Sequence, residues 1–248
     1  MIGIVAVSHS RALAEAAVEL ALQMGGAEPP VVRVAAGGPD GDLGTDAVAI
    51  AAAVDEADTG DGVLVIMDLG SAILSAETAL EFVGAPDRVR LSSAPFVEGL
   101  VSAVVTAAGG ADLVAVDAEV SGAGAAKRRQ LGDATDARDT AGDAGEGAPA
   151  SGGVAPDAES FEAVVTNPSG LHARPAATFV KAASRYDADV RIADLDAGGE
   201  EVSARSLLAL MALGARQGSR VRVSATGPQA RPALVELRAL IDDGFGER

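Results

Sequence analysis

The first half of the chain alternates short runs of β-branched residues with longer Ala- and Leu-rich segments whose apolar residues recur at helical spacing. This pattern predicts four strands, each followed by a helix. The strands are expected at 2–7, 31–34, 62–67 and 89–91, and the helices at 11–24, 46–57 (with Thr45 as N-cap), 71–82 and 96–108. Strands without a polar interruption are buried on both faces, so we expect an α/β domain in which helices cover both faces of a parallel sheet. Residues 112–120 fit a helix or a strand equally well.

The second half has a different order, βαββαβα. Strands are expected at 161–165, 190–193, 201–204 and 221–225, and helices at 173–185, 206–213 and 230–241. Gly198-Gly199 is typical of a tight hairpin turn, and Gly227-Pro228 of a stop before the last helix. This order predicts an α+β open-faced sandwich, an antiparallel sheet with its helices on one face.

Between these halves lies a segment that has too little apolar surface to bury. From 121 to 157 the large apolar residues are Leu131 and Val154, set among Ala, Gly, Asp and basic residues. Such a composition is typical of a flexible linker. The chain is therefore expected to form two domains, at 1–120 and 158–248.

The charge and composition narrow the class of partner. A formal charge of -17 disfavours a nucleic-acid surface, because such a protein repels the phosphate backbone. The absence of cysteine excludes disulfides and thiolate sites, and we expect neither a metal nor a cofactor. The first seven residues have no basic region and no apolar run long enough for a signal peptide or a membrane span. We expect a cytoplasmic protein that acts with protein partners and binds no membrane.

The candidate chemistry lies at the two histidines of the chain, His9 and His172. We expect each to stand at the end of an apolar strand, immediately before a helix. A largely uncharged imidazole is a nucleophile at neutral pH, and its phosphorylated form can pass the group on. The free N–H groups of a helix N-terminus can hold phosphoryl oxygens. Both positions are therefore candidate phosphoryl acceptors.

In the second half, His172 is followed by Arg174 and Pro175. The guanidinium offers a planar fork of donors to a phosphoryl group, and proline is tolerated in the first helical turn. The alternative interpretation is a helix N-cap beside a surface arginine. We favour the phosphoryl site, because nucleophile, cation and free amides meet within four residues.

Residues 161–243 resemble HPr, the histidine phosphocarrier of the bacterial phosphotransferase system. Two motifs carry the resemblance, Gly170-Leu-His-Ala-Arg-Pro175 and Arg205-Ser-Leu-Leu-Ala-Leu-Met-Ala-Leu-Gly214. The resemblance implies that His172 accepts phosphate from enzyme I on Nδ1, with Arg174 neutralising it. Ser206 aligns with a serine that some bacteria phosphorylate for regulation, although a helix N-cap is the interpretation we favour.

In the first half, His9 lies beyond the carboxyl end of a strand, where open α/β sheets bind ligands. Asp68 follows the third predicted strand and is placed to hold one ring nitrogen of His9. We expect the Gly70 and Ser71 amides and the Ser71 hydroxyl to face the phosphoryl group.

Two alternatives remain for these residues. Asp68 taken alone is equally typical of a helix cap. Ser8 and Ser10 are candidates for phosphoryl stabilisation and equally typical turn formers.

Residues 1–120 resemble the mannose-type IIA domains, and more closely the phosphotransfer subunits of phosphoenolpyruvate-dependent dihydroxyacetone kinases. The motifs are Val7-Ser-His-Ser10, Ala35-Ala-Gly-Gly38, Leu43-Gly-Thr-Asp46, Met67-Asp-Leu-Gly-Ser-Ala-Ile-Leu-Ser-Ala-Glu-Thr-Ala-Leu80 and Ala94-Pro-Phe-Val-Glu-Gly99. The family implies phosphorylation of His9 on Nε2, a hydrogen bond from its other nitrogen to Asp68, and a homodimer through this domain. Some members continue into a partial enzyme I domain; the chain ends without one, so a separate enzyme I is the expected donor.

The resemblance thus implies a phosphoenolpyruvate–glycerone phosphotransferase subunit that relays phosphate from enzyme I through His172 and His9. The acceptor would be ADP on the nucleotide-binding kinase subunit, for phosphorylation of dihydroxyacetone. One alternative is a IIA–HPr component of a mannose-class sugar transporter, and another is a regulatory module that senses phosphate flow. A nucleotide-binding enzyme is disfavoured, because the turn at His9 is neither a glycine fingerprint nor a P-loop.

Overall fold

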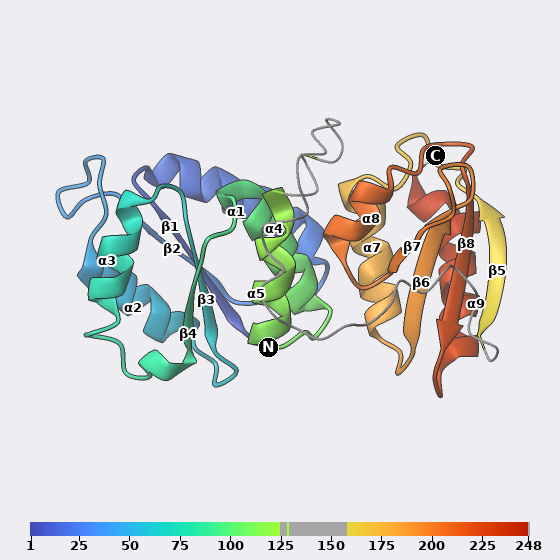
Figure 1. The fold of residues 1–248 in the computed structure, drawn as a ribbon. Helices are drawn as coiled ribbons and strands as arrows, with labels where there is room; N and C mark the ends of the chain where they lie inside the picture. Colours follow the sequence, from blue (N-terminus) through green and yellow to red (C-terminus); the bar gives the residue numbers. More distant parts are fainter. Residues whose placement is uncertain (125–127, 129–157, 248) are drawn as a thin grey trace, which may run out of the picture. The chain divides into compact units, whose positions relative to one another are not determined.

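The protein is described from a computed structural model, in which residues 1–124, 128 and 158–247 are described. The predicted linker therefore lies almost entirely outside the described residues. The chain divides into two compact units, Met1–Gly124 and Ala125–Arg248, and each is considered by itself (Figure 1). Within the described residues, no helix has the length and apolar character needed to cross a membrane.

The first unit is a parallel sheet in the order β2-β1-β3-β4 with helices on both faces (Figure 1). This confirms the predicted α/β architecture. Its elements are β1 (Gly3–Ser8), α1 (Arg11–Gly25), β2 (Val32–Ala36), α2 (Ala47–Ala57), β3 (Val63–Met67), α3 (Ser71–Ala79), a 3₁₀ turn (Pro86–Arg88), β4 (Val89–Ser92), α4 (Phe96–Ala108) and α5 (Leu113–Ser121).

The register of the central strands determines where the site forms. Alternate residues of β1 and β3, such as Val5 and Val65, pack in a core with α2 and α3. Helix α1 packs with α4, and α4 with α5. Val7 of β1 pairs with Met67 of β3, so the residues that follow these two strands emerge side by side.

The structure decides one ambiguous segment of the first unit and corrects one predicted helix cap. The ambiguous segment 112–120 is helix α5, whose N-cap Asp112 accepts a hydrogen bond from Ala115 N at 2.9 Å. The N-cap of α2 is Asp46, so the prediction of Thr45 was wrong. The hydroxyl of Thr45 instead lies 2.8 Å from Ser75 Oγ of α3, and the Asp46 carboxylate caps the helix.

The second unit is an antiparallel sheet in the order β5-β8-β6-β7, packed with three helices, which confirms the predicted open-faced sandwich (Figure 1). Alternation along β6 gives the sheet one apolar face, since Val190 and Ile192 are buried while Asp189 and Arg191 are exposed. The elements are β5 (Glu159–Val164), α7 (Ala173–Ser184), β6 (Asp189–Asp194), β7 (Glu201–Ser203), α8 (Leu207–Leu213), β8 (Arg220–Thr226), α9 (Ala230–Asp242) and a final 3₁₀ turn (Gly244–Gly246).

The connection between β6 and β7 is longer than the predicted tight turn. It spans residues 195–200 and is closed by a hydrogen bond from Gly199 N to Asp194 O at 2.8 Å. Gly198 and Gly199 both have positive φ, 110° and 73°. The two glycines supply the expected backbone conformations, but in a wider loop.

Candidate functional site

The first candidate site forms where β1 and β3 end. His9 follows β1, and Ser10 caps α1 by accepting a hydrogen bond from Leu13 N at 3.4 Å. Asp68 follows β3, and its N–H donates to Val7 O at 3.1 Å. The parallel pairing of the two strands thus places the Asp68 side chain next to His9.

Asp68 holds His9 through both carboxylate oxygens. Oδ1 lies 2.9 Å from the His9 Nδ1, and Oδ2 accepts from His9 N and from the Ser8 hydroxyl, each at 2.9 Å. Burial raises the pKa of Asp68, but the hydrogen bonds from His9 and Ser8 outweigh it and leave the pKa below 3.8. The carboxylate is therefore charged at neutral pH and only accepts. The proton of a neutral His9 ring accordingly resides on Nδ1, and Nε2 keeps its lone pair.

The Nε2 side of the ring faces the start of α3. Ser71 Oγ lies 3.0 Å from Nε2, and Ser71 is the first residue of that helix, with Gly70 as N-cap. The N–H groups of Ala72 and Ile73 donate to Leu69 O at 3.0 Å and to Gly70 O at 3.2 Å, and the start of the helix carries a partial positive charge. A phosphoryl group on Nε2 would lie next to a hydroxyl donor and this positive end.

The two serines that flank His9 have different contacts. Ser8 is fully buried; its hydroxyl donates to Asp68 and accepts from Ser10 N at 3.1 Å. The hydroxyl of Ser10 caps α1. In this geometry Ser8 orients Asp68, and Ser10 fixes the direction in which the helix leaves the site.

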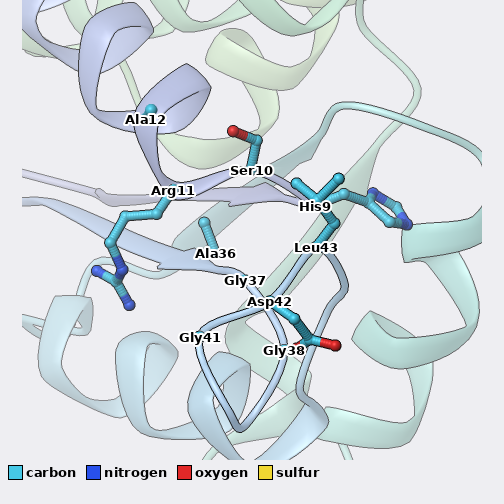
Figure 2. A pocket seen from close by; sticks show the side chains of 10 residues that line it. All are labelled: His9, Ser10, Arg11, Ala12, Ala36, Gly37, Gly38, Gly41, Asp42 and Leu43. Carbon is cyan, nitrogen blue, oxygen red and sulfur yellow. The ribbon is translucent and has the colours of Figure 1, made fainter.

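A glycine-rich loop forms one wall of a pocket beside His9, and its role was not recognised from the sequence. Gly37 N donates to Ser8 O at 3.1 Å and Gly44 N to His9 O at 3.0 Å, so the loop is attached to the backbone on both sides of the site. In Figure 2 the His9 ring and the Arg11 guanidinium extend away from each other across this loop. The pocket is lined by His9, Ser10, Arg11, Ala12, Ala36, Gly37, Gly38, Gly41, Asp42 and Leu43.

The second candidate site lies at the start of α7. His172 is the exposed N-cap residue, and its carbonyl accepts from Ala176 N at 2.9 Å. Arg174 is exposed in the first turn, whereas Pro175 is buried. An exposed imidazole, an arginine and first-turn amides therefore share the end of one helix. This arrangement can receive an anionic group from a partner.

The turn before His172 depends on a residue that sequence reasoning missed. Asn167 is 1% exposed, and its Nδ2 donates to Gly170 O at 2.8 Å. Gly170 has φ +63°, and a Cβ there would lie 2.4 Å from Ala215 O. This close approach explains why residue 170 is a glycine. The Asn167-Pro168 pair indicates a turn, but nothing in the sequence indicates that the Asn167 side chain is buried.

Ser206, the candidate regulatory position, is the N-cap of α8. Its Oγ accepts a hydrogen bond from Ala209 N at 3.0 Å. This is the geometry of an N-cap.

Comparison with known proteins divides the chain as the fold does. Residues 3–117 match the family model "PTS system fructose IIA component", and residues 159–243 match "PTS HPr component phosphorylation site". Phosphocarrier protein HPr of Vibrio cholerae is 46% identical over 78 residues, which cover 32% of this chain and 88% of that protein.

Other relatives match the whole chain, including both of its units. The phosphoryl donor subunit DhaM of the PEP-dependent dihydroxyacetone kinase of Escherichia coli K12 is 40% identical, and that of Klebsiella michiganensis is 38% identical. Each alignment covers 100% of this chain and 51% of the relative, so the chain spans about half the length of these proteins. The chain therefore contains a domain of the HPr family, preceded by one that matches the mannose-type IIA model, and it is similar over its whole length to these phosphoryl donor subunits.

Proposed function

We propose that the chain relays phosphoryl groups from enzyme I to His172, from His172 to His9, and from His9 to ADP bound on the nucleotide-binding subunit of a dihydroxyacetone kinase. The observation that carries the proposal is the His9 ring: Asp68 holds Nδ1, and Nε2 lies at the N-terminus of α3. The relatives named as phosphoryl donor subunits of that kinase supply the substrate. In this role the chain acts as a subunit of a phosphoenolpyruvate–glycerone phosphotransferase.

In the first step, a ring nitrogen of His172, Nδ1 in the HPr family, attacks the phosphorus of phosphorylated enzyme I. A P–N bond forms on His172, and the donor's P–N bond breaks with its electron pair returning to the donor ring. Arg174 and the first-turn amides of α7 neutralise the phosphoryl oxygens. The exposure of His172 gives the donor access.

In the second step, Nε2 of His9 attacks that phosphorus and the P–N bond to His172 breaks. The His9 ring becomes cationic as it gains the phosphoryl group, because Nδ1 keeps its proton. The charged Asp68 stabilises this ring, while Ser71 donates to a phosphoryl oxygen. A β-phosphate oxygen of ADP then attacks the phosphorus and restores neutral His9, and the ATP formed phosphorylates a hydroxyl of dihydroxyacetone.

The remaining parts of the proposal concern the setting. We expect a cytoplasmic homodimer that associates through the first unit and interacts with enzyme I and the kinase. Light scattering on the intact chain and on the separated first unit tests the dimer. A monomer in both samples would contradict it.

Intact-mass measurement tests the relay. With enzyme I and phosphoenolpyruvate, the chain should gain two acid-labile phosphates. His9→Ala should retain one, on His172. His172→Ala should gain none unless a separate HPr is added, which charges His9 in trans. A single phosphate on the intact chain, or an acid-stable one on serine, would refute the relay.

The acceptor is tested by adding the ADP-loaded kinase subunit and dihydroxyacetone to the phosphorylated chain. Phosphate on His9 should disappear as dihydroxyacetone phosphate forms, and His9→Ala should abolish this even with added HPr. If a membrane sugar transporter discharged His9 and the kinase did not, the alternative IIA–HPr transporter component would replace the kinase assignment.

A further inference from the structure

Asn167 clamps the turn that leads into His172. Its carbonyl accepts from Gly170 N at 3.1 Å, and its side-chain Nδ2 donates to Gly170 O at 2.8 Å. The next residue, Leu171, donates its N–H to Ala215 O at 2.9 Å. The direction in which the chain enters α7 at His172 is therefore set by the Asn167 amide and one neighbouring loop.

The same amide has a second partner far away in the sequence. Asn167 Nδ2 also donates to Glu247 Oε2 at 3.0 Å. The other side-chain atom, Oδ1, is buried without a hydrogen-bond partner among the described residues. Both contacts of the side chain thus run from its NH₂ group to groups that only accept. Because no group in the described part of the chain holds Oδ1, the Asn167 side chain depends on both acceptors for its orientation.

The segment that carries Glu247 packs against the helix that His172 begins. Phe245 adopts φ +57° and lies against Phe179 of α7, with ring centroids 6.4 Å apart. Non-glycine residues rarely adopt this conformation, so the packing against α7 must offset its strain. Gly244 approaches the same loop closely, since a Cβ there would lie 3.3 Å from Thr166 Oγ1. The segment is therefore fitted to the loop before His172.

We propose that Asn167 and Glu247 are positioning residues for His172: the Glu247 carboxylate orients the Asn167 amide, which fixes the Gly170 turn and so holds the imidazole at the start of α7. This inference rests on the proposed role of His172 as phosphoryl acceptor. It assigns no contact with the phosphoryl group to either residue. Losing Glu247 should slow the transfer step itself, while enzyme I still docks on an unchanged surface.

The test uses the full-length chain carrying His9→Ala, so that only His172 takes phosphate, and measures initial rates at varied chain concentration with catalytic amounts of enzyme I. Glu247→Ala should lower kcat about tenfold, with KM within about twofold, because a small misplacement of a nucleophile is costly. Glu247→Gln should restore most of the rate, since its amide oxygen still accepts. Glu159→Ala, which removes an exposed carboxylate on β5, is the matched control and should leave both kcat and KM unchanged.

A double variant separates positioning from a general loss of fold. If Glu247 acts through Asn167, then Asn167→Ala combined with Glu247→Ala should be no slower than Asn167→Ala alone. Additive losses, a change confined to KM, or an unchanged Glu247→Ala rate would each overturn the inference. Should Asn167→Ala fail to fold, the rates of Glu247→Ala and Glu247→Gln decide. If the parent chain itself gained no phosphate on His172, the proposed function would fail instead.

Discussion

Asp68 Oδ1 lies 2.9 Å from His9 Nδ1, and the opposite ring nitrogen lies 3.0 Å from Ser71 Oγ. The ring is thus held at both ends, by an acceptor that is charged at neutral pH and by a hydroxyl that can donate or accept. This polarity leaves Nε2 as the nucleophile. Each contact can be removed by a separate substitution, and the two substitutions should slow phosphorylation of His9 to different extents.

The first prediction is that Asp68→Asn slows phosphorylation of His9 by phosphorylated HPr about 10- to 100-fold. The substitution preserves shape but removes the charge that stabilises the cationic phosphorylated ring. Its amide can also present an N–H to Nδ1 and so favour the wrong tautomer. Quenched-flow kinetics measures the rate. Asp87→Asn removes an exposed carboxylate and is the control; equal rates for both variants would contradict the assigned role of Asp68.

A second prediction concerns pH. The pKa of Asp68 is lower in the folded protein than its usual value, so its charge stabilises the fold above about pH 4, and this stabilisation is lost as the pH falls through the folded pKa. Ser8→Ala removes one hydrogen bond that lowers this pKa. The pKa should therefore rise, and the His9 contact should be lost at a higher pH than in the parent protein. Carbon-13 NMR of the Asp68 carboxyl measures the shift; an unchanged pKa would show that the Ser8 hydroxyl contributes little.

The local pattern was sufficient to place His9 and Asp68 after strand ends and His172 before a helix, while their roles stay predictions. The prediction that His172 stands at the end of a strand was wrong, because residues 165–171 lie between β5 and His172. The segment 112–120 was ambiguous because its short apolar run fits both periods, although Val116 and Val120 are buried at helical spacing.

Contacts between residues far apart in the sequence could not be predicted from the sequence. Thr45 and Asp46 are adjacent and both can cap a helix, and the choice depends on Ser75, thirty positions away. The Asn167–Glu247 contact spans eighty positions, and its partners have no shared pattern. Such pairs are set by tertiary packing, which local propensity does not contain.

The third prediction is that Ser71→Ala lowers the rate of His9 phosphorylation about tenfold, equivalent to ~1.4 kcal/mol. The hydroxyl can donate to the phosphoryl group that forms on Nε2, and a hydrogen bond to a charged group at an exposed site lies near the lower end of its usual range. The same kinetic assay applies. Ser121→Ala, which removes an exposed hydroxyl bonded to Asp117 O, serves as the control. An unchanged rate in Ser71→Ala would contradict this prediction and would leave the backbone of α3 as the main stabiliser of the phosphoryl group.

The last prediction separates backbone strain from steric exclusion at the turn before His172. Gly170 and Gly199 have similar positive φ, 63° and 73°, but a Cβ on Gly199 would meet open space, whereas one on Gly170 would lie 2.4 Å from Ala215 O. Gly199→Ala should cost about 1 kcal/mol in the free energy of unfolding, and Gly170→Ala about 3 kcal/mol or more, because backbone must move.

Urea titration followed by tyrosine fluorescence measures both changes, since the chain has no tryptophan and its one tyrosine, Tyr186, lies in the second unit. Equal losses in the two variants would mean that only φ matters at Gly170. The loop from Ala215 would then have room to retreat, and Gly170→Ala should still accept phosphate on His172 at the parent rate. A larger loss at Gly170 should be accompanied by slower phosphorylation, because relief of the clash shifts the turn that directs His172 into α7.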